Sequence, residues 1–168
     1  MTTLYTASVP VFKQMLSALS DVLNKAEAHA TDKKIDPNVF LQSRLFPDMF
    51  PLIRQVQIAA DFAKSVPSRL AGIEVPAYDD SEQSFAELQT RIKNTLAVLD
   101  GFTAAQIEGK ETLEIVLRPG TPKEKKLTGE TYLLNYGLPQ FFFHVTTAYA
   151  ILRSNGVEVG KRDFMGAY

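Results

Sequence analysis

Three long segments of the chain carry apolar residues at steps of three and four, the spacing of a helix that buries one face. The first segment predicts a helix over about residues 8–30. Its apolar stripe consists of Val9, Phe12, Leu16, Leu19, Leu23 and Ala26. Pro10 falls in the first turn, where its missing N–H is not needed. A chain with this spacing is expected to be mainly helical.

The second segment predicts a long helix that is capped by Asp48 and ends at Gly72. Pro51 must then lie in its first turn, and Pro67 should kink or end it. A short helix over residues 37–42 precedes it. The stripe of the long helix consists of Leu52, Val56, Ala59 or Ala60, Ala63, Val66 and Leu70.

The third segment predicts a helix that starts at Ser81 and ends at Gly101, after a crossing loop over residues 74–80. Thr103 and Gln106 have the spacing of a capping box for one short helical turn. The stripe of the third helix consists of Ser84, Phe85, Leu88, Ile92, Thr95, Leu96 and Leu99.

A small β-hairpin and a fourth long helix are predicted for the rest of the chain. Two short arms, residues 113–117 and 125–127, flank a turn of sequence Pro-Gly-Thr-Pro. Residues 129–155 are apolar with few breakers, and Pro139 predicts a kink near Tyr136. Four long helices with a hairpin inserted before the last predict an antiparallel four-helix bundle. A length of 168 residues predicts one domain over residues 1–168.

Charge and composition exclude several classes of partner. The 18 basic and 19 acidic side chains are interspersed, so no nucleic acid is expected to bind. The dense basic run, residues 123–126, is interpreted as a solvated hairpin arm. The absence of cysteine excludes disulfides and thiolate chemistry. We find no leader pattern and no apolar run of about 18 residues, so we expect a cytoplasmic protein with no membrane partner.

Two histidines limit the chemistry of the chain. His29 lies near the polar end of the first helix and is interpreted as a surface or helix-end residue. His144 follows three phenylalanines in the most apolar helix, so it should be buried and should need a polar partner. Such a histidine is either a satisfied core residue or a ligand of a metal or small molecule.

A polar cluster can be built around His144. Gln140 lies one helical turn before it on the same face, and Gln57 and Asp61 share a face of the second long helix. Inward polar clusters in helical bundles form metal and ligand sites, but an amide network that fixes helix register has the same sequence pattern. We therefore take these four residues as candidates for a ligand-binding pocket. No glycine-rich phosphate loop and no serine triad accompanies them.

The sequence resembles the DinB/YfiT-like superfamily of putative metalloenzymes, and within it a bacterial family of unknown function. The resemblance to the superfamily rests on HVTTAYAILRSNG (residues 144–156). The resemblance to the narrower family runs from end to end and rests on DMFPL (residues 48–52), RQVQ (54–57), LPQFFFHVTTAY (138–149) and GKRDF (160–164).

The resemblance implies an antiparallel four-helix bundle, often a homodimer, with a divalent metal held by three histidines. His144 matches the second histidine of the last helix. Gln140 stands at the first, and Gln57, or less favourably Gln55, stands at the histidine of the second helix. Because amides replace two imidazoles, a tight zinc or nickel site is not expected. A weakly bound divalent ion at His144, with Asp61 and amide oxygens, is the remaining metal hypothesis.

Three functions follow as hypotheses. The first is a bundle with an altered central site that binds an unknown small molecule without a tight metal. The second is a divalent-metal-dependent hydrolase or thiol transferase that uses His144. The third is a dimeric structural or interaction protein, which should expose an apolar patch that includes Phe141 or Phe142. The sequence leaves open whether the protein is an enzyme.

Overall fold

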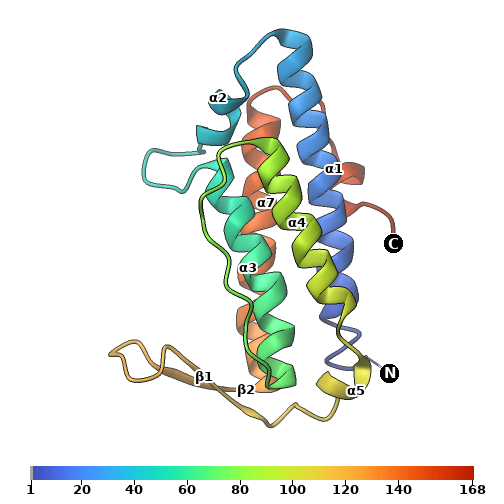
Figure 1. The fold of residues 1–168 in the computed structure, drawn as a ribbon, viewed down its shortest axis with the longest axis vertical. Helices are drawn as coiled ribbons and strands as arrows, with labels where there is room; N and C mark the ends of the chain where they lie inside the picture. Colours follow the sequence, from blue (N-terminus) through green and yellow to red (C-terminus); the bar gives the residue numbers. More distant parts are fainter. Residues whose placement is uncertain (1) are drawn as a thin grey trace.

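The computed structural model describes residues 2–168 and is mainly helical, with one small two-stranded sheet (Figure 1). Its long helices are α1 (Val9–Lys33), α3 (Leu52–Ala71), α4 (Phe85–Asp100) and α7 (Leu138–Ser154). The shorter elements are α2 (Pro37–Gln42), α5 (Ala104–Ile107), β1 (Glu114–Leu117), β2 (Lys125–Thr128), α6 (Gly129–Thr131), the π-helix η1 (Tyr132–Gly137) and α8 (Lys161–Met165). Within residues 2–168, no helix combines the length and apolar character needed to cross a membrane.

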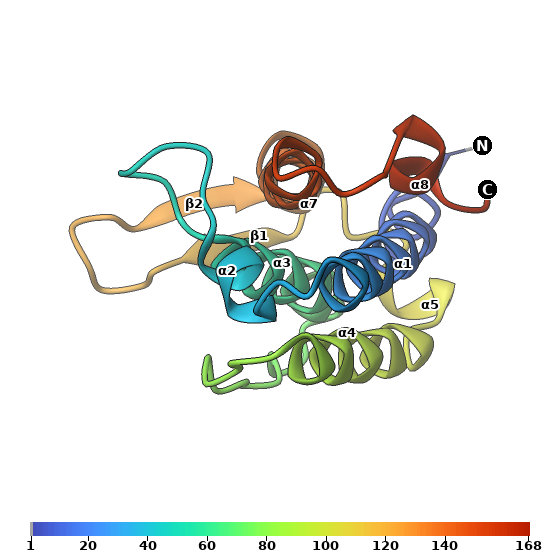
Figure 2. The ribbon, with the colours of Figure 1, turned by 90° about the horizontal axis from the view of Figure 1, so that it is seen from above.

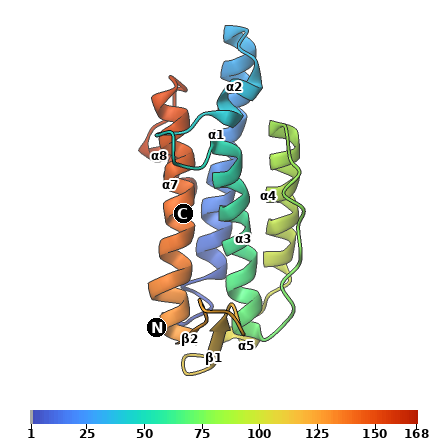
Figure 3. The same cartoon turned by 90° about the vertical axis from the view of Figure 1, so that its left-hand side faces the viewer.

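The four long helices lie side by side, and α1 and α3 have neighbours on both flanks (Figure 2). Figures 1 and 3 show that α1 and α7 run in one direction and that α3 and α4 run in the other. The loop of residues 73–84 makes this possible, because it returns along α3 before α4 begins. This is the crossing loop that the sequence predicts.

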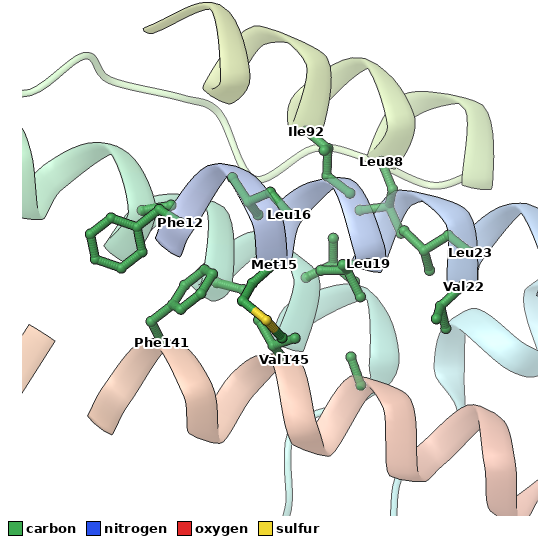
Figure 4. Packing of buried hydrophobic residues seen from close by; sticks show 14 of the residues in the cluster. Phe12, Met15, Leu16, Leu19, Val22, Leu23, Leu88, Ile92, Phe141 and Val145 are labelled. Carbon is green, nitrogen blue, oxygen red and sulfur yellow. The ribbon is translucent and has the colours of Figure 1, made fainter. Parts of the chain in front are cut away.

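The core lies between these helices, and α1 is at its centre. Figure 4 shows Leu88 and Ile92 of α4 on one side of α1, and Phe141 of α7 on the other. The rings of Phe12 and Phe141 meet edge to face, with centroids 4.8 Å apart. Burial of each such side chain contributes on the order of 1.5–3 kcal/mol. The periodic stripes of the sequence therefore form the observed core.

The run of three phenylalanines divides between core and surface. Phe141 is fully buried and Phe142 is partly buried, whereas Phe143 is 55% exposed. Phe141 therefore contributes nothing to the predicted apolar patch, because its helical position faces α1, and Phe142 is the one of the two that keeps an exposed edge. Phe143, two residues after Phe141, points about 200° away around the helix.

Two helix starts differ from the sequence prediction. Helix α3 begins after Pro51, which occupies the N-cap position in extended conformation, so Asp48 is not its cap. Helix α4 begins after Ser84 and not at Ser81, because the Ser84 hydroxyl accepts a hydrogen bond from the backbone N–H of Glu87. The Glu87 carboxylate in turn accepts a hydrogen bond from the N–H of Gln83. These reciprocal bonds satisfy two N–H groups that the helix itself leaves unpaired.

The end of α3 lies beyond its internal proline. Pro67 is buried inside the helix, which continues to Ala71 and ends where Gly72 adopts a φ of 68°. The packing of both neighbours, Val66 and Ser68, against the core outweighs the hydrogen bond that proline removes. Gly72 is thus the stop that the sequence predicts, while Pro67 does not end the helix.

The hairpin agrees with the sequence prediction, and the last helical segment agrees with it in position. Strands β1 and β2 pair antiparallel, with Glu114 opposite Thr128. The predicted kink near Tyr136 takes the form of η1, a π-helix that joins α6 to α7. Gly137 ends this π-helix against α3, where a Cβ atom would lie 2.7 Å from Val66 Cγ2. The local widening of the helix and this close approach fix how the hairpin meets α3.

The C-terminal helix α8 docks on α1. Gln14 Nε2 donates a hydrogen bond to the carbonyl oxygen of Met165 (2.9 Å), and Lys25 Nζ lies 2.5 Å from the Asp163 carboxylate. Phe164 packs edge to face against Tyr149 of α7. This segment therefore straps α1 to α7, and none of these contacts involves the polar groups near His144.

Candidate functional site

The structure separates the four pocket candidates into distinct surroundings. His144 is buried between α7 and α3, while Gln57 and Asp61 belong to a network of charges beside α4. Gln140 lies at the mouth of a groove next to the hairpin. The sequence placed these residues in one cluster because helical spacing alone does not give the rotation of each helix.

His144 is held by Gln55 and by two aromatic rings. Its Nδ1 atom lies 2.7 Å from Gln55 Oε1. Phe62 stacks on the imidazole at 6.2 Å, and Phe143 meets it edge to face at 5.2 Å. Gln55, the less favoured of the two glutamines in the sequence, is thus the one that lies beside His144.

The hydrogen bonds fix the tautomer of His144. Gln55 Nε2 donates to the carbonyl oxygen of Phe50 (3.0 Å), so Gln55 Oε1 is the atom that faces the imidazole and it can only accept. The proton of neutral His144 therefore lies on Nδ1, and Nε2 carries the lone pair. Burial, assisted by the positive charge of Arg54, lowers the pKa of His144 to about 4. The imidazole is accordingly neutral near pH 7.

The donors around His144 do not fit the three-histidine metal site of the superfamily. Gln55 directs its oxygen at Nδ1 and uses its amide nitrogen elsewhere, so Nδ1 of His144 is already occupied by a hydrogen bond. The charge of Arg54 opposes a cation at this position. No group of three or more histidine, cysteine, aspartate or glutamate residues within positions 2–168 has the geometry to hold a metal ion.

Gln57 and Asp61 lie in a network of paired charges centred on Arg91 of α4. The Arg91 side chain is only 1% exposed and contacts Asp61 Oδ1 (2.8 Å), Asp80 Oδ1 (3.0 Å) and Glu82 Oε1 (2.8 Å). Gln57 Nε2 donates to Glu82 Oε2 (2.8 Å). The crossing loop is thereby tied to both α3 and α4.

Two further cations complete this network. Lys64 Nζ lies 2.7 Å from Asp61 Oδ1 and 4.6 Å from the ring centroid of Tyr78. Arg54 pairs with Asp80. Burial alone would lower the pKa of Arg91, but its hydrogen bond to Glu82 and the neighbouring carboxylates outweigh burial and raise that pKa. Arg91 therefore keeps its charge at the centre of a structural network of ion pairs.

A groove between α3, η1 and the hairpin contains the other polar candidates, and we call it the Tyr136 groove. Tyr136 lines three adjoining cavities, of about 180, 170 and 280 Å³. Asp61 and Arg69 line the first, and Gln140 lines the other two. Two of the four predicted pocket residues, Asp61 and Gln140, thus reach the same groove from different helices.

The floor of the Tyr136 groove is aromatic. The ring of Phe62 contacts Tyr136 on one side (5.9 Å) and His144 on the other (6.2 Å), so His144 lies one ring away from the groove. Tyr136 also stacks on Tyr132, which is fully buried. Burial raises the pKa of Tyr132, and its hydroxyl accepts a hydrogen bond from Arg69 Nη1 (3.0 Å).

The hairpin covers the groove with basic side chains. Arg118, Lys123 and Lys125 line its 170 Å³ cavity, and Arg118 lines the 180 Å³ cavity as well. Arg118 has a φ of 51°, a left-handed conformation that costs a residue other than glycine about 1 kcal/mol or more. The basic run is exposed as the sequence predicts, but two of its lysines face the groove.

Arg91 and the residues of the Tyr136 groove are functional candidates that the sequence did not indicate. Arg91 had a visible signal, because it falls between Leu88 and Ile92 on the buried face of the third helix. The positive φ of Arg118 has no comparable signal in a single sequence, because it depends on how the hairpin packs, and Pro139 predicts an irregularity at η1 but not its π-helical form.

Comparisons with known proteins agree with this fold. The family described as Domain of unknown function (DUF1993) matches residues 4–165. The crystal structure of a DinB family member protein from Shewanella denitrificans is similar, with 47% sequence identity and a TM-score of 0.93, over 98% of this chain and 93% of that chain. No curated protein matches the chain.

Proposed function

This chain belongs to the DUF1993 family within the DinB-like superfamily, and we propose that it is a four-helix bundle that binds a small molecule in the Tyr136 groove without a tightly held metal ion. The observation that carries this proposal is the position of Tyr136, where three cavities meet. Ligand sites are typically concave, with apolar walls and a few convergent polar groups. The Tyr136 groove has both.

The local backbone supports the same position. A π-helix and a residue of positive φ are each unusual, and both features recur at functional sites. Here Tyr136 of η1 and Arg118 line the same groove. Their coincidence favours the Tyr136 groove over an accidental surface depression.

A larger cavity between α4 and the crossing loop is a weaker candidate. It measures about 360 Å³, and Tyr78, Glu82 and Arg91 are among its lining residues. Glu82 and Arg91 pair with each other and hold the loop in place. Their paired atoms are therefore committed to the fold, and within the described part of the chain the buried side-chain atoms here that have no hydrogen-bond partner are Arg91 Nε and the Tyr78 hydroxyl.

The metal-dependent hydrolase or transferase gains no support from the donor set around His144. Nε2 is the one nitrogen that His144 could offer a metal ion, because Nδ1 is hydrogen-bonded to the amide oxygen of Gln55. We therefore assign no chemical step to a metal ion.

An interaction surface is a second candidate function. The loop between α2 and α3 exposes Leu45, Phe46 and Phe50 to solvent. Large exposed apolar side chains close together in sequence favour association, including the homodimer that the superfamily implies. Measurement of mass in solution for the native chain and for a Phe46→Ser variant tests this. A monomeric native chain would contradict it.

A single introduced tryptophan tests the binding proposal, because the chain contains none. Tyr136→Trp places an indole in the groove, and Tyr168→Trp places one on the exposed last residue as the matched control. A library of small fragments should change the emission of the first variant and leave that of the second unchanged. Equal responses, or none from either, would overturn the proposal.

A further inference from the structure

We infer that the Tyr136 groove recognises a small organic anion, a carboxylate or a phosphate on an apolar body, and that Arg69 and Arg118 hold its charged group. This inference rests on the proposed function. It adds the chemical class of the ligand.

The charge around the groove is strongly biased, although the chain as a whole carries −1. Its lining contains four basic side chains, Arg69, Arg118, Lys123 and Lys125, and one acidic side chain, Asp61. None of the four basic side chains forms an ion pair with any residue between positions 2 and 168. A cluster of uncompensated cations attracts an anion.

Asp61 does not cancel this attraction. Its Oδ1 atom lies 2.7 Å from Lys64 Nζ and 2.8 Å from Arg91 Nη2, so its negative charge is already matched by two buried cations. At the 180 Å³ cavity the guanidinium groups of Arg69 and Arg118 therefore dominate the electrostatic potential.

Arg69 is already oriented for such a ligand. Its Nη1 atom donates to the Tyr132 hydroxyl, which is fixed in η1 and fully buried. A guanidinium has five N–H donors in a rigid plane, and this contact uses one of them. An oxyanion in the cavity would meet donors whose direction is set before it binds.

The backbone of Arg118 is strained at the position where its side chain lines the groove. It follows the last residue of β1, and its φ of 51° turns the chain at the point where the side chain lines both cavities. Glycine would adopt this conformation without strain. Because the strained Arg118 lines both cavities, whereas the strained Lys34 only ends a helix, its position supports a role for the guanidinium.

The apolar part of the ligand follows from the remaining walls. Phe62 and Tyr136 present aromatic surface, and Leu117 of β1 closes the cavity from the hairpin side. A cavity of about 180 Å³ accommodates a body of the size of one aromatic ring. Benzoate and phenyl phosphate are therefore suitable probes for the two anion types, and benzyl alcohol is their neutral counterpart.

The test compares these three probes on the full-length protein by amide chemical shifts in two-dimensional NMR. Benzoate or phenyl phosphate should shift the amides of residues 61–69 and 115–118, and benzyl alcohol should bind at least about tenfold more weakly, the ratio expected for a charge-assisted hydrogen bond. Tighter binding of phenyl phosphate than of benzoate would identify a phosphorylated ligand, and the reverse order would identify a carboxylic acid.

Arg118→Gly separates this role from a structural one. The variant should lose about tenfold or more in affinity for the anions, while its melting temperature should rise because the strain at φ 51° is relieved. Lys34→Gly is the matched control, since Lys34 is also a cation of positive φ (55°) but lies at the end of α1. It should gain stability without losing affinity.

Each outcome decides a different point. Equal binding of benzyl alcohol and the two anions in the groove would overturn the anion assignment and leave the proposed function intact. Equal losses of affinity in Arg118→Gly and Lys34→Gly would also overturn it, because they would show an effect of net charge alone. Failure of all three probes to shift any groove residue, while fragments still alter the emission of Tyr136→Trp, would overturn the anion class and not the groove.

Discussion

The Nδ1 atom of His144 on α7 lies 2.7 Å from the Oε1 atom of Gln55 on α3. This contact joins two long helices, and the Nδ1–H group of the imidazole donates to the amide oxygen. The phenylalanines around the ring deprive the charged form of water, and Arg54 disfavours it further. The protonation state of His144 is therefore coupled to the stability of the fold.

The first prediction is that acid destabilises the folded protein through His144. The pKa of His144 is about 4 in the folded protein, against 6.5 for the unperturbed group. Between these pH values the unfolded chain binds a proton that the folded chain does not, so stability present above pH 6.5 is lost as pH falls toward 4. We expect this residue to account for a loss of about 3 kcal/mol in the free energy of unfolding. Urea unfolding above pH 6.5 and near pH 4 measures it.

His144→Gln should remove that part of the pH dependence, because the variant has no group to titrate at this position. His29→Gln is the control, since it alters the one other histidine and leaves His144 in place. The prediction would be contradicted if the unfolding free energies of the native chain and of His144→Gln fell by the same amount between pH 6.5 and pH 4.

The second prediction concerns Arg91. Arg91→Met leaves the carboxylates of Asp61, Asp80 and Glu82 without their common partner, so we expect a loss of about 3–5 kcal/mol in unfolding free energy. Lys25→Met removes an exposed ion pair with Asp163 and should cost no more than about 1 kcal/mol. Denaturant titration of both variants measures the contrast, and similar losses would show that Arg91 is not a buried centre of charge.

The third prediction concerns metal. The donors around His144 lead us to expect no near-stoichiometric zinc or nickel in protein purified without a histidine tag or chelating resin. Elemental analysis of the native chain and of His144→Ala provides the test. A metal ion that is present in the first and absent from the second would restore the metalloenzyme hypothesis.

The fourth prediction concerns the close approach of η1 to α3. Gly137→Ala would place a Cβ atom 2.7 Å from Val66 Cγ2, so we expect a loss of about 1–3 kcal/mol in unfolding free energy. Gly160→Ala, which meets nothing closer than 3.9 Å, should be nearly neutral. If the contact with Val66 is the cause, Val66→Ala should lower the unfolding free energy less in the Gly137→Ala variant than in the native chain. Equal losses in the two backgrounds would argue against this contact as the cause.

The sequence predicted most elements because their signals are local. The stripe of α1, the Asp36 cap of α2, the Gly72 stop and the capping box of α5 all depend on residues within a few positions of each other. The start of α4 lies three residues later than predicted, although Ser84 and Glu87 have the spacing of a capping box and Ser81 has no such partner. That local signal identifies Ser84 as the cap.

The candidate site was harder to predict because it depends on helix rotation. Gln55 and Gln57 differ by about 200° around α3, so one of them faces α7 and the other faces the crossing loop. The sequence favoured the wrong one as the neighbour of His144. The charges paired with Arg91 come from α3 and from the loop, and no spacing within the sequence brings those groups together.

The π-helix between Tyr132 and Gly137 has an evolutionary consequence. A π-helix accommodates one residue more than a regular α-helix over the same path, and each residue of an α-helix turns the chain by about 100°. In a regular α-helix one extra residue would rotate the preceding hairpin by that angle about the axis of α7, whereas the π-helix absorbs the residue locally. Homologues that lack one residue in this segment should therefore keep the direction of the hairpin and lose only the widened turn beside the groove, so the shape of the groove would vary within the family while Arg118 stays at it.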